Sequence, residues 1–459
     1  PASFKEGEGW QLAKPQDGFN HGAWWELYGD ATLNDLQTRL VAANQTLAQS
    51  LASYRQAQAL AKGARSSFFP TISADVGKTR SGQGTGSGGS VRLPDGSTVA
   101  SGGGSSSISN SYSASLGVSW ELDLWGKLRR QLEADNASMD ASAADLANSR
   151  LSLQSQLTQN YLQLRVMDQQ IKLLNDTVSA YQRSLKLTEN QYNAGIVTKA
   201  DVAQARTQLK STEAQAIDLK YQRAQLEHAI AVLVGVPPAQ FSLAAVEGVP
   251  SLPSVPALLP SELLQRRPDV ASAERQVISA NAKIGVAKAA WFPDLTLTAA
   301  GGYRSGSFQN CIETPNRYWS IGPQFAMSLF DGGLIASQVG QAEASYDQTV
   351  ASYRQTVLDS FREVEDYMVQ LKVLEEESGV QQEALDAARE ALRLTTNQYK
   401  AGTIDYSNVV TTQTSALSNE RTLLTLTGSR LTASVQLIAA LGGGWNAAKI
   451  AEEGQATRD

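Results

Sequence analysis

Leu187-Thr188-Glu189-Asn190-Gln191-Tyr192-Asn193-Ala194-Gly195 and Leu394-Thr395-Thr396-Asn397-Gln398-Tyr399-Lys400-Ala401-Gly402 are nearly the same stretch, written twice. They lie 207 residues apart and differ only at their third and seventh positions. Upstream, Phe69-Pro70 recurs as Phe292-Pro293, 223 residues later. Self-similarity at long spacing indicates a repeated structural unit. The sequence therefore predicts two copies of one unit.

The repeat divides the chain into two copies and three flanking segments. The copies are assigned to residues 33–235 and 261–443, and segments 1–32, 236–260 and 444–459 lie outside them. Each copy is predicted to run helix, strand, loop, strand, very long helix, tight turn and return helix. Both copies close with a glycine after the last helix, which helix C-termini prefer.

Four segments alternate between apolar and small polar residues, the pattern of β-strands with two different faces. From Tyr112 to Leu124 every even position is apolar, and the odd positions are Ser, Gly, Glu or Asp. Aromatic residues cluster at the strand ends, as in transmembrane β-barrels, and the Gly- and Ser-rich segment Lys78–Asn110 is predicted to be a polar loop. Strands are predicted at about 70–78, 112–124, 294–304 and 318–330.

Four strands are too few to close a barrel, because the smallest barrels need about eight. Open sheet edges are not tolerated in lipid, so the chain must oligomerise. Two, three or four copies give about 8, 12 or 16 strands, and about eight strands leave no open lumen. A duct therefore requires three or more chains. The acids on the polar face, Asp75, Glu121 and Asp123, are predicted to line the lumen and to favour the passage of cations.

Two segments, 128–194 and 334–401, are too long to be helices of a compact domain. Between Leu128 and Asn193 there is neither proline nor glycine. A helix of this length extends on the order of 100 Å. Apolar residues recur at spacings of three and four, so each helix has a stripe for neighbouring helices.

Return helices are predicted at Lys199–Leu233 and Asp405–Leu441, which form αα-hairpins with the long helices. The return helices are about half as long as their partners. Shorter helices at Leu33–Ala61 and Ser261–Ala290 are expected to stack on them end to end. Long helices at one end and strands at the other are not explained by a soluble coiled-coil scaffold.

Composition excludes several classes of function. The net charge is −6 and no run of Lys or Arg is present, which argues against nucleic acid as a partner. The single cysteine, Cys311, excludes an intrachain disulfide. With only two histidines, His21 and His228, neither a metal cluster nor a Ser-His-Asp site is expected. No apolar stretch of about 18 residues is present, so no membrane-spanning helix is predicted. We expect no enzyme, no cofactor and no metal.

The chain resembles the outer-membrane factor family, the TolC and OprM-type channels of tripartite RND multidrug efflux pumps. The resemblance rests on Trp24-Trp25-Glu26-Leu27-Tyr28-Gly29-Asp30, on Arg267-Pro268-Asp269-Val270 and on the two hairpins. It implies an α+β membrane protein, with a trimeric transmembrane β-barrel of about 12 strands, four from each chain. A long periplasmic α-helical barrel would continue the β-barrel, and the flanking segments would form an equatorial domain. It also implies a homotrimer in the outer membrane, in contact with its lipid, and a lipid anchor on a cysteine before Pro1.

The resemblance also implies partners and sites. The hairpin tips would dock a periplasmic adaptor (membrane fusion) protein, which links the duct to an inner-membrane RND-type transporter. Family members often carry Leu-Leu-Asp-Ala-Gln after the second turn, whereas this chain has Val409-Val410-Thr411-Thr412-Gln413. The gate is therefore placed at the nearest polar residues, Asp405, Tyr406, Asn408 and Asp201. The predicted docking residues are Tyr192, Ala194, Gly195, Tyr399, Ala401 and Gly402.

The predicted function is passive conduction of drugs and other small molecules from the periplasm to the exterior. A gate at the periplasmic end would open when the pump assembles. Two alternatives stay open: the same duct in type I protein secretion, and a non-conducting trimeric surface scaffold. A neighbouring gene for a proton-driven drug transporter would favour efflux over secretion.

Overall fold

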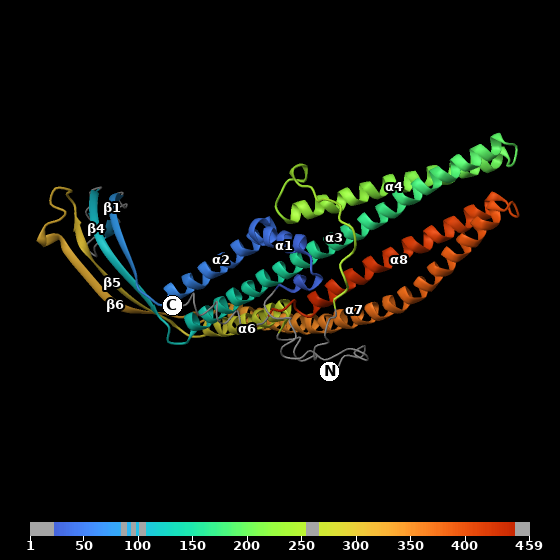
Figure 1. The fold of residues 1–459 in the computed structure, drawn as a ribbon. Coiled ribbons are helices and arrows are strands. Elements are labelled where there is room, and N and C mark those ends of the chain that lie inside the picture. The colour runs from blue at the N-terminus through green and yellow to red at the C-terminus, as the bar shows by residue number, and fades with distance from the viewer. Residues whose placement is uncertain (1–22, 84–89, 93–97, 101–106, 254–265, 446–459) are drawn as a thin grey trace. The chain divides into compact units, whose positions relative to one another are not determined.

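The computed structural model describes residues 23–83, 90–92, 98–100, 107–253 and 266–445 (Figure 1). The chain divides into two compact units. Four of the described helices have residues in both units. The first unit comprises residues 1–56, 139–276 and 349–459, and the second comprises residues 57–138 and 277–348.

Some predicted segments fall wholly or partly outside the described residues. These are the start of the N-terminal segment, the end of the 236–260 linker and nearly all of the 444–459 tail. The predicted lipid anchor before Pro1 also lies outside them and stays a prediction.

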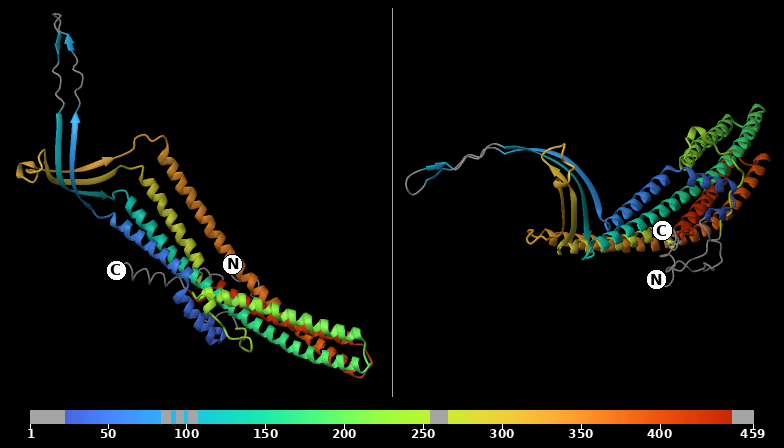
Figure 2. Two further views of the ribbon diagram at one scale, coloured as in Figure 1. Left: turned by 90° about the horizontal axis from the view of Figure 1, so that it is seen from above. Right: turned by 90° about the vertical axis from the view of Figure 1, so that its left-hand side faces the viewer.

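A four-stranded antiparallel sheet lies in the second unit (Figures 1 and 2). Its strand order is β1-β4-β5-β6, so β1 and β6 are the edges. Their bounds are β1 Thr71–Gln83, β4 Ser107–Leu122, β5 Asp294–Ser305 and β6 Arg317–Ala326. Each predicted strand is present, but β6 ends at Ala326, short of the predicted end at residue 330.

The prediction that Lys78–Asn110 is entirely loop is wrong. Strand β1 continues to Gln83 and β4 starts at Ser107, where mostly polar residues pair in register from Thr79↔Ser111 to Gln83↔Ser107. Two further short strands, β2 (Ser90–Arg92) and β3 (Thr98–Ala100), pair with each other. Apolar content alone did not reveal these extensions, because small polar residues pair as well as apolar ones in an antiparallel ladder.

Two αα-hairpins form most of the first unit, and their helix lengths are the same in both copies. Helix α3 has 67 residues, as has α7, and α4 has 35 residues, as has α8. The turns pass through glycines with positive φ, Gly195 (74°) and Gly402 (72°). The bounds are α3 Lys127–Asn193, α4 Lys199–Leu233, α7 Leu334–Lys400 and α8 Tyr406–Ala440.

The expectation of a single helix over Leu33–Ala61 is wrong. Two helices occupy the region, α1 (Ala31–Ala43) and α2 (Gln45–Ser66). Asn44 interrupts them with an extended ψ of 124°. Its Oδ1 accepts a hydrogen bond from the Leu47 N–H at 2.9 Å and so caps the second helix. The other short helix, α6 (Pro268–Ala289), begins with a proline at a position where helices tolerate it.

An equivalent hydrogen bond lies at the end of the return helix in both copies. Asn44 Nδ2 donates to the carbonyl of Leu233, the last residue of α4, at 2.8 Å. Arg267 Nη1 donates to the carbonyl of Ala440, the last residue of α8, at 3.2 Å. Arg267 lies 223 residues after Asn44, and Ala440 lies 207 residues after Leu233, the two offsets of the sequence repeat. Each return helix therefore ends against the start of a short helix, as expected.

The main core lies in the first unit around α1, α3, α4 and the end of α8. Leu33, Leu36 and Leu157 are fully or almost fully buried there, together with Tyr161 and Ile438. Short 3-10 helices, Trp24–Tyr28, Pro238–Gln240 and Thr314–Asn316, occur in the connecting segments. None of the helices in the described part of the chain combines the length and hydropathy that a membrane crossing requires.

Candidate conduction and gating sites

One face of the sheet is an apolar band exposed in the single chain. The register aligns Ile72 with Val118, Val118 with Ala299, and Ala299 with Ile321, so the apolar rows run across all four strands. Ile72 is 73% exposed and Ile321 is 66% exposed. A band of this extent must be covered by lipid or protein. Its exposed members are Ile72, Val76, Ile108, Leu116, Trp120, Trp319, Ile321 and Phe325.

The other face carries the predicted lumen acids. Asp75 aligns with Ser115 on β4, and its carboxylate accepts a hydrogen bond from Ser73 Oγ at 3.3 Å. Asp75 makes no ion pair with any residue that the structure describes. Glu121 does make one, because Lys127 Nζ lies 3.0 Å from its Oε1. Asp75 therefore carries the least compensated charge of the predicted lumen acids.

Asp123 serves as a cap for helix α3. Its carboxylate accepts hydrogen bonds from the backbone N–H groups of Leu128 and Arg129, each at 3.0 Å, and from Arg129 Nε at 3.0 Å. Burial by itself raises the pKa of Asp123, but these bonds together hold the pKa below its ordinary value. Asp331 makes the corresponding bonds to Gly333 and Ile335 before α7. The lumen role predicted for Asp123 stays a prediction, but its carboxylate is already engaged.

The predicted docking residues lie at the two turns of the first unit. Ala194, Gly195, Ala401 and Gly402 are exposed, and Tyr192 is 42% exposed. The two tyrosines have different surroundings, because Tyr399 is half-buried and its hydroxyl donates to Gln191 Oε1 at 2.8 Å. The docking role of all six residues stays a prediction.

The predicted gate residues lie at the start of the two return helices, where Asp201 and Asn408 occupy equivalent positions of the repeat. Asp201 closes a capping box, since its Oδ2 accepts hydrogen bonds from the Thr198 backbone N–H at 2.9 Å and from Thr198 Oγ1 at 2.7 Å. Asp405 is the N-cap of α8, but its side chain makes no capping bond. Asp405 and Asn408 are exposed, one turn apart on the same helix. These two side chains are therefore free to meet a partner.

Tyr406 is buried inside the chain, unlike the other predicted gate residues. Its hydroxyl lies 3.1 Å from Ser184 Oγ on α3, and its ring lies 5.3 Å from the ring of Tyr399. Val409 and Ala205 are buried with it. Burial raises the pKa of the Tyr406 phenol, and the Ser184 hydrogen bond offsets part of the shift. Tyr406 thus packs the two hairpins together. Sequence spacing did not reveal this role, because Ser184 and Ala205 lie on the other repeat.

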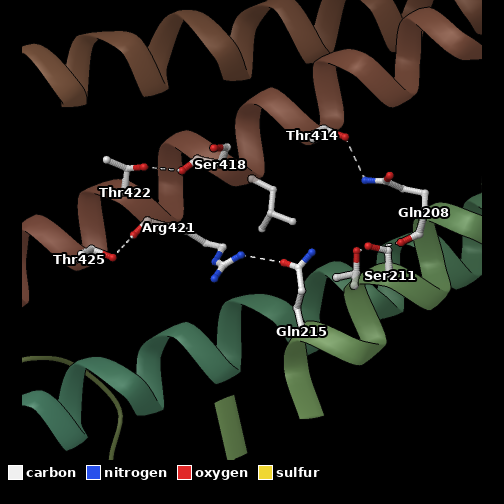
Figure 3. Close-up of a pocket in the computed structure, with 10 residues that line it drawn as sticks. Gln208, Ser211, Gln215, Thr414, Ser418, Arg421, Thr422 and Thr425 are labelled. Atoms are coloured by element: carbon white, nitrogen blue, oxygen red, sulfur yellow. Dashed lines mark hydrogen bonds between the residues drawn. The ribbon is translucent and has the colours of Figure 1, made fainter. Parts of the chain in front are cut away.

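A polar groove of about 420 Å³ lies between α4 and α8 (Figure 3). Gln208 Nε2 donates to Thr414 Oγ1 at 3.1 Å, and Arg421 Nη1 donates to Gln215 Oε1 at 2.7 Å across the groove. Ser211, Ser418, Thr422 and Thr425 contribute further hydroxyl groups to its walls. The sequence analysis missed this set, and the only signal for it is the row of Gln, Ser and Thr on both return helices.

Groups suited to metal chemistry are not gathered in the described residues. None of these residues form a set of three His, Cys, Asp or Glu side chains able to hold a metal ion. Cys311 is buried, and its thiol lies 3.5 Å from the carbonyl oxygen of Tyr112. The described surfaces are an apolar band, a polar sheet face and polar helix faces.

Sequence relatives place these features in a known group of proteins. The chain matches the Outer membrane efflux protein family over residues 36–236 and 259–443. It is 31% identical over 426 residues to the pyoverdine export outer membrane protein OpmQ of Pseudomonas aeruginosa, covering 92% of this chain and 87% of the relative. It is 30% identical over 425 residues to the toluene efflux pump outer membrane protein TtgC of Pseudomonas putida, covering 92% and 85%.

Solved structures share the fold over nearly the whole chain. The outer-membrane channel OprN superposes with a TM-score of 0.86 at 28% identity, covering 97% of this chain and 96% of that one. The open state of the Neisseria gonorrhoeae MtrE outer membrane channel gives 0.78 at 25% identity, covering 90% and 89%. The fold is that of trimeric outer-membrane channels, and channels of this kind are not enzymes. The chain belongs to the outer membrane efflux protein family.

Proposed function

We propose that this chain forms the outer-membrane exit duct of a tripartite efflux pump. Three copies close one barrel and conduct drugs and other small molecules passively. A periplasmic adaptor docks at the hairpin tips, and an inner-membrane RND-type transporter supplies the energy. A gate that includes Asp405 and Asn408 stays closed until the pump assembles. Asp201 and Tyr406 support the gate, the first by capping α4 and the second by packing the hairpins.

The observation that carries this proposal is the sheet with one exposed apolar face and two unpaired edges. The four strands expose an apolar band on one side and small polar residues on the other. Strands β1 and β6 each lack a second neighbour in the described chain. Lipid accepts no open edge, so further copies must supply the missing neighbours. Three chains give about 12 strands, enough to enclose water.

The test is conductance of the purified protein in planar lipid bilayers. Wild type is expected to insert and to conduct poorly, because the gate is closed. The double variant Asp405→Ala with Asn408→Ala is expected to increase the open fraction at least several-fold, since it removes the exposed polar groups at the start of α8. Ser407→Ala is the matched control, because Ser407 is an exposed residue on the same turn of α8 but on another face.

Each result bears on a different part of the proposal. Insertion with an open double variant and an unchanged control supports both the duct and the gate. Insertion with wild-type conductance in all variants removes Asp405 and Asn408 from the gate. Failure of the folded protein to insert at all contradicts the duct and favours a non-conducting scaffold.

A further inference from the structure

The two hairpins of one chain meet along a defined contact, here called the intrachain seam. Hairpin 1 consists of α3 and α4, and hairpin 2 of α7 and α8. Near the tips, Tyr399 of hairpin 2 donates to Gln191 of hairpin 1, and Tyr406 meets Ser184. Further along, the seam contains three more hydrogen bonds, Gln208 to Thr414, Arg421 to Gln215 and Gln170 to Thr425.

The two hairpins are structurally equivalent at an offset of 207 residues. Their helices have the same lengths, as described above. The ion pair between Arg223 and Asp168 in hairpin 1 recurs between Arg430 and Glu375 in hairpin 2. Both residues of the second pair lie 207 residues after those of the first. The offset therefore identifies side chains in equivalent positions.

The hydrogen bonds of the intrachain seam come from one flank of each hairpin, although Ala214, Asp218 and Thr422 beside them also line the grooves of that seam. Adding 207 to the seam residues of hairpin 1 gives the equivalent positions on hairpin 2. Subtracting 207 from the seam residues of hairpin 2 gives the equivalent positions on hairpin 1. All ten positions found in this way are exposed in the single chain. They are Tyr192, Lys199, Thr207, Ala214 and Asp218 on hairpin 1, and Gln398, Ala391, Ser415, Thr422 and Glu377 on hairpin 2.

A second copy of the chain is the occupant that these flanks fit. In a ring of identical chains, hairpin 2 of one copy meets hairpin 1 of the next, which is the order of the intrachain seam. The pair at the tip keeps its chemistry, because Tyr192 replaces Tyr399 and Gln398 replaces Gln191. Neither of these two side chains has a hydrogen-bond partner among the residues that the structure describes.

We propose that Tyr192 of one copy donates a hydrogen bond to Gln398 of the next copy and that this interchain seam is the weaker of the two. The proposal rests on the proposed function, since it assumes a closed ring of chains. It names the residues that join the copies at the hairpin ends and the seam that separates when the duct opens.

The substitutions between the two seams explain the difference in strength. The buried Tyr406 of the intrachain seam is replaced by the exposed Lys199, and its partner Ser184 by Ala391, which has no hydroxyl group. The Arg421 to Gln215 bond is replaced by Ala214 and Thr422. The Gln170 to Thr425 bond is replaced by two carboxylates, Glu377 and Asp218, which repel each other at neutral pH. The interchain seam therefore has fewer hydrogen bonds and less buried apolar surface.

Thiol cross-linking tests the contact. In a Cys311→Ser background, Tyr192→Cys with Gln398→Cys should give covalent dimers and trimers with a short bifunctional maleimide. A disulfide is unsuitable, because a tyrosine and a glutamine joined through their ends hold their backbones too far apart. The control pair, Tyr192→Cys with Asn397→Cys, turns one thiol by about 100° around the helix and should give far less product. Gln191→Cys with Tyr399→Cys should react within one chain and stay at monomer mass.

Conductance tests which seam opens. Cross-linking the interchain pair should hold the duct closed. Cross-linking an intrachain pair outside the predicted docking residues, Gln208→Cys with Thr414→Cys, should leave conduction unchanged. Tyr192→Phe should raise the open fraction about five-fold for each hydrogen bond lost. Lys199→Tyr with Ala391→Ser installs the Tyr406 and Ser184 pair in the interchain seam and should lower the open fraction.

The outcomes separate this inference from the proposed function. A protein that neither oligomerises nor inserts contradicts the duct itself. A conducting trimer in which the control pair reacts as well as Tyr192→Cys with Gln398→Cys overturns the contact. A conducting trimer in which the intrachain cross-link blocks opening as strongly as the interchain one overturns the order of strength.

Discussion

Arg165 is the residue on which three separate segments of the first unit converge. Its guanidinium pairs with Asp30, the N-cap of α1, and hydrogen-bonds the hydroxyl of Tyr161 and the carbonyl of Gly248. Both charged side chains are nearly buried, at 9% and 12% exposure. A buried ion pair is costly to break, because the remaining charge has no partner and no water.

Replacing Arg165 with Met is expected to lower the free energy of unfolding by about 3–5 kcal/mol. The control is Arg393→Met, because Arg393 pairs with Glu390 on the surface, where water screens the attraction and an ion pair contributes little to stability. Chemical denaturation of the protein in detergent measures both. Equal losses in the two variants would contradict the role assigned to burial.

Asp123 gives the chain a predictable response to acid. Its pKa is below the ordinary value of about 3.9, so its contribution to stability is present above that pH. The contribution is lost as the pH falls below about 4 through the pKa of the folded state. Asp123→Asn should therefore lower the midpoint of thermal unfolding at pH 6 and have a much smaller effect near pH 3. A difference that stays constant between these two pH values would rule out the charged cap.

At the scale of elements, the join between α4 and the α1–α2 break depends on Gly235. Its φ is +73°, and a Cβ added there would lie 2.4 Å from the carbonyl oxygen of Ala43. Gly195 has nearly the same φ, +74°, but a Cβ added at that position would have no other atom within 4 Å. Substitution of Gly195 therefore tests backbone strain alone, and substitution of Gly235 tests the same strain together with steric overlap.

Gly195→Ala is expected to cost about 1–2 kcal/mol, the cost of the left-handed conformation alone. Gly235→Ala should cost clearly more, because the backbone of α1 must also move. Thermal unfolding of both variants makes the comparison. If both midpoints fall equally, the close approach of α4 to Ala43 does not contribute to stability.

At the scale of the whole molecule, the uncompensated acid on the polar face of the sheet should set ion selectivity. Asp75 makes no ion pair among the described residues, whereas Glu121 is paired with Lys127. Asp75→Asn should therefore reduce the preference for cations more than Glu121→Gln does, since fixed charges in a pore tune permeation. Reversal potentials in salt gradients across planar bilayers measure the preference. Unchanged selectivity in both variants would show that neither carboxylate faces the ions.

Much of the architecture was predictable because its signals are local. Strict period-two alternation identified all four strands of the sheet. The absence of proline from both long segments, which contain only Gly340 and Gly379 as glycines, identified α3 and α7 to within one residue. The break at Asn44 was missed, since Asn is a poor but tolerated helix residue and only its bonds to Leu47 and Leu233 reveal the interruption. The extension of β1 to Gln83 was missed because a Gly- and Ser-rich segment carries no apolar pattern.

The sequence by itself determined the repeat, the two faces of the strands, the lengths of the hairpins and the need for further copies, because each depends on residue spacing along one chain. Only the tertiary structure decided that Tyr406 is buried against Ser184, that Asp123 caps α3 and that Tyr399 binds Gln191. The first and last of these pairs join residues more than 200 positions apart, as Ser184–Tyr406 (222) and Gln191–Tyr399 (208) show. Side-chain contact at such separation depends on how helices pack, which no local pattern of residues specifies.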